Sequence, residues 1–180
     1  MANPSTLYRF KISLSDVDRS VYELLNLRVA MHSSESVDFL LTRVLAFALN
    51  FEEGLEFSPG LSTPDEPAIK LQDGGGQILR WIDIGNPTAK RLNKASKSAK
   101  SVRVYTYKDP ENLKREAANE RIYRSKEIEI FSLSAAFLTP LGKTLVRDNA
   151  WSLIHNDGEL IVSVGEESFM CTLQKHRLEG

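Results

Sequence analysis

The sequence contains very little cysteine, since Cys171 is its one thiol among 180 residues. An internal disulfide needs two thiols, so the chain has no disulfide framework, as is typical of proteins from a reducing compartment. No apolar run approaches the ~20 residues that a membrane-spanning helix needs. The N-terminus lacks a basic stretch followed by an apolar one, so no secretory signal is expected. These absences predict a cytoplasmic protein without a membrane partner.

The sequence also lacks an excess of charge of either sign, with 23 basic and 24 acidic residues and a net charge of −1. Proteins that bind nucleic acid without sequence preference are usually clearly basic, because neutralised phosphates supply much of the affinity. The balance argues against tight, metal-free binding along a long duplex. It is compatible with a nuclease, because carboxylates in an active site offset basic residues nearby.

Neither a repeat, nor a low-complexity tract, nor a linker between domains interrupts the chain. Its length is sufficient for one substantial core, so a single domain over residues 1–180 is expected, with a monomer as the default state. With 42% hydrophobic and 26% charged residues, the composition is that of an ordinary globular protein.

Apolar periodicity predicts a mixed α/β (α+β) fold: a central mixed sheet with a strand–helix–strand crossover, flanked by helices and with antiparallel hairpins at both ends. The expected hairpins lie within residues 6–31 and 149–175. Between them, Ser34 is the expected N-cap of a long apolar helix, and Asn86 the expected N-cap of the crossover helix. The other expected elements are strands over 55–71, 78–85, 102–107 and 128–133, and helices over 110–123 and 135–141.

The segment Ile78–Gly85 is apolar on both alternating faces, which predicts a central strand covered on two sides. Asp83 lies near its end, sharing a face with Leu79 and Trp81. A buried carboxylate without a partner is costly, so Asp83 needs a cation, a hydrogen-bond donor or a proton. Asp83 is therefore the position where the sequence itself most clearly predicts chemistry.

Several ordered motifs carry a resemblance to a known family. They are His32-Ser33-Ser34-Glu35, Asp65-Glu66-Pro67, Trp81-Ile82-Asp83-Ile84-Gly85-Asn86-Pro87, Arg91-Leu92-Asn93-Lys94-Ala95 and Val102-Arg103-Val104-Tyr105. With these motifs, nearly the whole chain resembles the YaeQ family, which has a variant of the PD-(D/E)XK nuclease fold. The resemblance implies a restriction-endonuclease-like core over about residues 34–134.

The resemblance also implies a magnesium site. Asp83 would be one ligand, either Asp65 or Glu66 the second carboxylate, and Glu35 the acid from the start of the long helix. Magnesium in proteins is held by a few carboxylate oxygens and keeps several waters. It would lower the pKa of a bound water and stabilise charge on the scissile phosphate.

The chain departs from the standard acid-x-Lys pattern, because Gly85 occupies the lysine position after Asp83. In this superfamily a lysine can project instead from the following helix. Lys94 is the preferred candidate, with Lys90 one turn earlier on the same face. Arg91 belongs to the same Arg-x-x-Lys-Ala pattern and is also a candidate catalytic cation.

Each candidate also has a purely structural interpretation. Asp83 can accept hydrogen bonds at a strand end, Asp65 and Glu66 can be solvated loop acids, and Glu35 can serve only the helix dipole. Lys90 and Lys94, with Lys97, can form a solvated helix face opposite the apolar one.

Three functions follow. The first is a magnesium-dependent nuclease or nucleic-acid-processing protein that hydrolyses phosphodiester bonds. The second is a catalytically inactive nuclease-like module that binds nucleic acid or a protein partner, as Gly85 and the balanced charge suggest. The third, a small-molecule-binding protein, has no positive support in the sequence.

Overall fold

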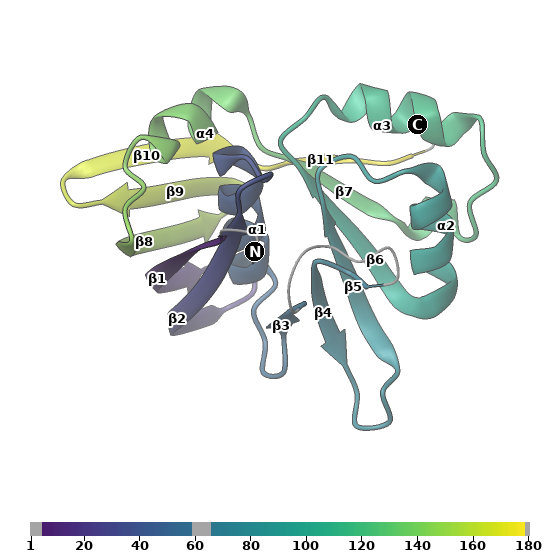
Figure 1. Ribbon diagram of the computed structural model, residues 1–180, viewed down its shortest axis with the longest axis horizontal. Helices are drawn as coiled ribbons and strands as arrows, with labels where there is room; N and C mark the ends of the chain where they lie inside the picture. The colour runs from purple at the N-terminus through teal and green to yellow at the C-terminus, as the bar shows by residue number, and fades with distance from the viewer. Residues whose placement is uncertain (1–4, 59–65, 179–180) are drawn as a thin grey trace. The chain divides into compact units, whose positions relative to one another are not determined.

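The structure is a computed structural model that describes residues 5–58 and 66–178 (Figure 1). The strands are β1 (Ser5–Asp16), β2 (Val21–His32), β3 (Glu56–Phe57), β4 (Ile69–Gln72), β5 (Ile78–Ile84), β6 (Ala99–Thr106), β7 (Glu129–Ser132), β8 (Asp148–Asn156), β9 (Glu159–Val164), β10 (Glu167–Thr172) and β11 (Gln174–His176). The helices are α1 (Val37–Leu49), α2 (Ala89–Ser98), α3 (Pro110–Ala118) and α4 (Ala135–Gly142), with a short 3-10 turn η1 (Ser125–Glu127).

The strands form two sheets, one with five strands in the order β10-β9-β8-β1-β2 and one with six in the order β11-β7-β6-β5-β4-β3. Both sheets contain parallel and antiparallel pairs, which confirms the mixed α+β class. The strands that were expected to form one central sheet are divided between these two sheets. Among the described residues, no helix is long and apolar enough to cross a membrane.

The chain divides into two compact units. Unit 1 comprises Met1–Leu49 and Leu133–Leu173, and unit 2 comprises Asn50–Ser132 and Gln174–Gly180. Each unit contains one of the two sheets. The core expected over about 34–134 is split between them, because α1 belongs to unit 1. The single domain over residues 1–180 stays a prediction.

Unit 1 contains both expected terminal hairpins. β1 and β2 pair in an antiparallel register from Ser5–His32 to Asp16–Val21, which confirms the first hairpin. β8, β9 and β10 pair successively in antiparallel fashion, which confirms the second group. The two groups join through a parallel pair between β1 and β8, a contact that links the two ends of the sequence.

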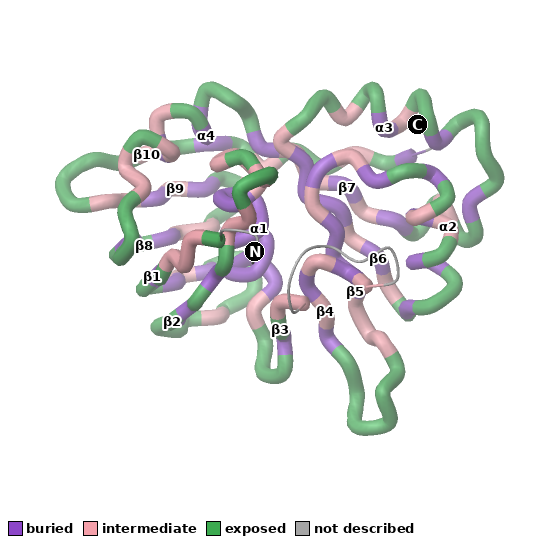
Figure 2. Tube along the Cα trace, in the orientation of Figure 1, coloured by how far each residue is buried: buried purple, intermediate pink, exposed green. Residues whose placement is uncertain are grey.

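α1 is buried along nearly its whole length, as the purple tube in Figure 2 shows. Its N-cap differs from the expected Ser34, because the amide of Phe39 donates to Oγ of Ser36 at 3.1 Å. Oγ of Ser34 instead contacts Nδ1 of His32 at 2.7 Å. Residues 33–35 form a turn before the helix, so the cap lies two residues later than the sequence pattern indicated.

Unit 2 contains the expected crossover: β5, α2 and β6 follow one another, and β5 pairs in parallel with β6. β7 continues the parallel set beside β6. One face of this sheet packs against α2 and α3 through a cluster of buried apolar side chains, among them Trp81, Leu92, Val104, Leu113 and Ile130. The N-cap of α2 is Thr88, whose Oγ1 accepts from the amide of Arg91 at 3.1 Å, rather than the expected Asn86. Oδ1 of Asn86 instead accepts from the hydroxyl of Thr106 at 2.7 Å.

Candidate functional site

Asp83 lies on the face of β5 that packs against α2, with only 2% of its surface exposed. In the parallel register it is level with Val104 of β6, and Val104 is level with Ile130 of β7. Both apolar neighbours are fully buried. The carboxylate therefore sits in an apolar row of the sheet, where the cost of burying an unpaired charge is high.

Arg91 supplies the partner that this burial demands. Its Nε donates to Oδ2 of Asp83 at 2.6 Å, and its Nη2 donates to Oδ1 at 3.0 Å. Paired contacts of this kind match the planar fork of guanidinium to both oxygens of one carboxylate. The guanidinium carbon also lies 5.5 Å from the centroid of the Trp81 ring. Because α2 is capped at Thr88, its first turn places Arg91 directly over the end of β5.

Glu66 meets the same guanidinium through its main chain. Nη2 of Arg91 donates to the carbonyl oxygen of Glu66 at 2.6 Å, so one nitrogen joins the segment before β4 to Asp83. The structure thus brings together Asp83, Arg91 and the backbone of Glu66. The other candidate carboxylate, Asp65, lies outside the described residues.

Lys90 and Lys94 are exposed on α2, whereas Arg91 is partly buried. The one-turn spacing of the two lysines holds, but the cation of α2 that contacts Asp83 is Arg91. The reason is geometric, since residue 91 falls between the apolar face with Leu92 and the exposed face.

Glu35 belongs to unit 1, and its contacts are local. Its Oε1 accepts from the amide of His32 at 2.7 Å, and its Oε2 lies 4.0 Å from Nη2 of Arg43. Arg43 also donates to the carbonyl of Ala30 at 2.7 Å. Burial lowers the pKa of Arg43 below its usual value, and the nearby Glu35 offsets part of this shift. These contacts connect Glu35 to the junction between β2 and α1.

Gly85, which stands where the standard pattern has lysine, follows β5 with φ of 87°. Residues other than glycine rarely adopt this region of φ, because their Cβ atom would crowd the backbone. Its amide donates to the carbonyl of Tyr105 at 2.8 Å and so continues the pairing with β6. Glycine at position 85 is therefore explained by backbone conformation.

The observed pairing decides how well these residues fit a magnesium ion. Both oxygens of Asp83 already accept from Arg91, so a metal ion would compete with the guanidinium for this carboxylate. Within the described residues, no group of three His, Cys, Asp or Glu side chains is placed to hold a metal ion. The candidate ligand Asp65 lies outside these residues, and the magnesium site stays a prediction.

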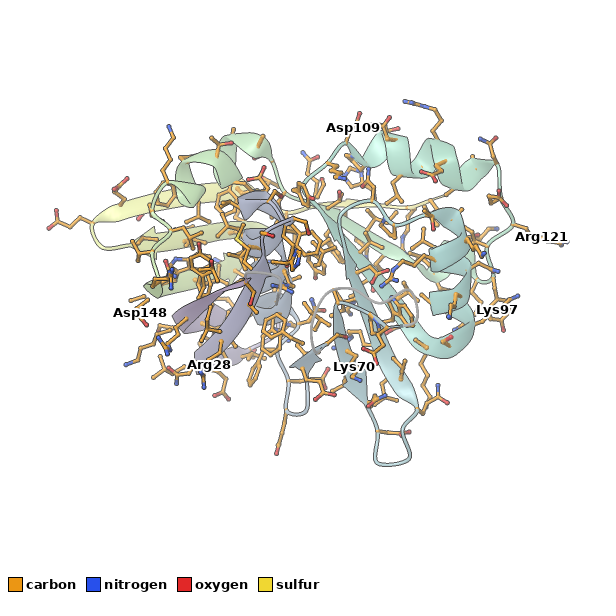
Figure 3. All side chains as sticks on the ribbon, in the orientation of Figure 1. Arg28, Lys70, Lys97, Asp109, Arg121 and Asp148 are labelled. Atoms are coloured by element: carbon orange, nitrogen blue, oxygen red, sulfur yellow. The ribbon has the colours of Figure 1, made fainter. Side chains whose placement is uncertain are left out.

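The same helix has a basic surface, which the sequence reasoning interpreted as a solvated face and did not connect with an anionic partner. From Gly85 to Lys108 the sequence has lysines and arginines but no aspartate or glutamate. Lys90, Lys94 and Lys97 are exposed on α2, and Lys100 is exposed at the start of β6. Figure 3 labels Lys97 on the outer side of α2. We call these four residues the lysine face; the absence of acids over this stretch was the sequence signal that could have pointed to an anionic partner.

Comparisons of sequence and of structure both show similarity to proteins of one family. The model of the YaeQ protein family matches residues 1–173. The "Uncharacterized protein YaeQ" of Escherichia coli (strain K12) is 34% identical over 107 residues, which is 59% of this chain and 59% of the relative. That of Salmonella typhi is also 34% identical over 107 residues, 59% of each chain. The chain thus matches over less than two thirds of these relatives.

Two crystal structures are similar over almost their full lengths. The YaeQ protein from Xanthomonas axonopodis pv. citri has a TM-score of 0.89 and 31% identity, with 97% of this chain and 99% of that chain covered. The YaeQ protein from Pseudomonas syringae has a TM-score of 0.88 and 30% identity, with 97% of each chain covered.

Proposed function

The chain belongs to the YaeQ family, and we propose that it binds nucleic acid through the lysine face of α2 and the start of β6. The observation that carries this proposal is the acid-free stretch from Gly85 to Lys108, in which each of the four lysines of the lysine face is exposed. Within the described residues, Lys90, Lys97 and Lys100 make no ion pair with an acid of the chain. Their charge is therefore available to an anionic partner.

The spacing of the lysines suits a phosphate backbone. Lys90, Lys94 and Lys97 follow at intervals of four and three residues, so they share one side of the helix. At ~1.5 Å per residue they cover ~10 Å along the axis, which corresponds to about three nucleotides of one strand at ~3.4 Å each.

Helix electrostatics also favour an external anion at this place. The first turn of α2 has no acidic residue and instead contains Lys90. Positive charge near the N-terminus opposes the helix dipole, so the lysine is not there to stabilise the helix. A bound phosphate would be attracted by the lysines and by the dipole together.

The Asp83–Arg91 pair acts as an anchor in this proposal. It fastens the first turn of α2 to the end of β5, and the apolar contacts of Leu92 and Ala95 hold the following turn. A fixed helix presents its lysines in a defined line, which lowers the entropic cost of binding.

Fluorescence anisotropy with a labelled single-stranded and a labelled double-stranded oligonucleotide tests the proposal across a salt series. The triple variant Lys90→Gln/Lys94→Gln/Lys97→Gln should make the slope of log K against log salt shallower by about 2 for a single strand or about 3 for a duplex. The matched control Lys114→Gln/Lys126→Gln/Lys143→Gln removes the same charge elsewhere and should leave the slope nearly unchanged. Equal slopes for both triple variants would overturn the proposal.

Magnesium-dependent phosphodiester hydrolysis is a second candidate function. It is favoured by one contact pattern: Asp83 and the backbone of Glu66 meet at the same nitrogen of Arg91. A metal ion at Asp83 would compete with the Arg91 guanidinium for the carboxylate and would supply electrophilic stabilisation of the phosphate.

An oligonucleotide cleavage assay with magnesium tests this second function independently of binding. Cleavage by the wild type and its loss in Asp83→Asn would support it, and loss in Lys94→Ala would assign a role to the preferred lysine. Binding without cleavage over single- and double-stranded DNA and RNA would leave the nuclease-like chain as a binding module.

A further inference from the structure

The outward face of the five-stranded sheet in unit 1 contains a hollow of about 450 Å³. It is formed over β1, β2 and β8, entirely within unit 1. Its lining residues are Arg9, Phe10, Lys11, Asn26, Leu27, Arg28, Asp148, Asn149 and Ala150. Four of them, Arg9, Lys11, Asn26 and Arg28, have exposed side chains that offer hydrogen-bond donors.

The strand register places like charges together in this hollow. Arg9 of β1 is directly opposite Arg28 of β2, so the two arginines share one face of the sheet. Lys11, two residues further along β1, lies on that face opposite Asn26. Like charges directly opposite one another in a sheet are destabilising.

The chain compensates this positive charge only in part. Nη1 of Arg9 lies 3.5 Å from Oδ1 of Asp148, with side chains 55% and 73% exposed, so the pair is weak. Within the part of the chain that the structure describes, Lys11 and Arg28 make no ion pair. Figure 3 labels Arg28 and Asp148 along the same side of the sheet.

We propose that this hollow binds a phosphate group, held by Arg9, Arg28 and Lys11 with Asn26 as a neutral donor. Guanidinium groups match phosphate oxygens in paired hydrogen bonds, and lysine adds a point charge. A bound phosphate places negative charge between the two arginines and so removes their repulsion. The volume is of the size usual for small-ligand sites, so the phosphate can belong to a larger molecule.

This inference goes beyond the proposed function, because the hollow lies in unit 1 and the lysine face lies in unit 2. The phosphate can come from a free phosphate compound or from the backbone of a nucleic acid. The two sources share the same recognition chemistry, and the experiment below separates them.

Thermal unfolding with inorganic phosphate, compared with sodium chloride at equal ionic strength, tests the site. At a concentration tenfold above its Kd, phosphate should raise Tm by about 3–6 °C. Arg28→Gln should abolish this rise. The same variant without phosphate should be at least as stable as the wild type, because it removes a like-charge pair. Lys143→Gln removes an exposed cation elsewhere in unit 1 and should keep the full rise.

A second series of thermal unfolding measurements, with a short single-stranded oligonucleotide as the ligand, identifies the source of the phosphate group. A rise with inorganic phosphate that depends on Arg28 supports the site with a free phosphate compound as its ligand. A rise that depends on Arg28 and appears only with the oligonucleotide supports it with a nucleic-acid backbone. If neither rise depends on Arg28, or if Arg28→Gln destabilises the phosphate-free protein, the proposal is wrong.

Discussion

Replacing Arg91 with alanine should destabilise the protein strongly, because it leaves Asp83 without its cation. The Asp83 side chain is only 3% exposed, and both of its oxygens are bonded to Arg91, at 2.6 and 3.0 Å. Removing one partner of a buried pair costs about 3–5 kcal/mol, since the remaining charge is uncompensated. For a chain of this length, that loss corresponds to a fall in Tm of about 6–20 °C.

Urea unfolding followed by circular dichroism measures this loss. Arg80→Ala is the matched control, because Arg80 also makes a contact of 2.6 Å, to Glu52, but with side chains 21% and 48% exposed. An ion pair this accessible to water should contribute about 0–1 kcal/mol. Arg91→Lys keeps the charge but loses the fork, so it should fall between the wild type and Arg91→Ala.

The double variant Asp83→Ala/Arg91→Ala separates the charge from the packing. If the uncompensated carboxylate causes the loss, the double variant should be more stable than Arg91→Ala alone. If instead Arg91 contributes by its contact with Trp81, the double variant should be no more stable than the single one. Equal losses for Arg91→Ala and Arg80→Ala would refute the reasoning altogether.

Two further predictions follow from other parts of unit 2. Gly85→Ala should cost about 1–2 kcal/mol in urea unfolding because of its φ of 87°, and not more, since the added Cβ would meet Cε1 of Tyr107 at 3.8 Å, an ordinary contact. A loss well above this range would show that crowding dominates. Burial, and then the nearby Lys114, lower the pKa of His176 below its ordinary 6.5, so the folded state favours neutral imidazole. The contribution of neutral His176 to the free energy of unfolding should be present above about pH 6.5 and be lost as the pH falls through the lowered folded pKa. His176→Gln should remove this pH dependence. An unchanged pH profile of stability in that variant would contradict the assignment.

The main elements were readable from local patterns. The patterns over residues 6–31 and 149–175 predicted the β1–β2 and β8–β9 hairpins, and the connection of the second has Asp157 and Gly158 at positive φ. Such features are predictable because the residues that decide them are neighbours in the chain. The caps show the limit of this reasoning: Ser36 and Thr88 act where Ser34 and Asn86 were expected, since several adjacent residues can serve and the packed helix selects one.

The sequence by itself determined that Asp83 would be buried and would need a partner, because the apolar strand around it is written in adjacent residues. Only the tertiary structure decided that the partner is Arg91. Lys90, Arg91 and Lys94 lie on the same helix and all have the required charge, and the rotation of α2 against β5 selects the one residue that reaches both oxygens. The division into two sheets was decided in the same way. The parallel pairing of β1 with β8 joins residues far apart in the sequence, and such contacts depend on packing that no local pattern encodes.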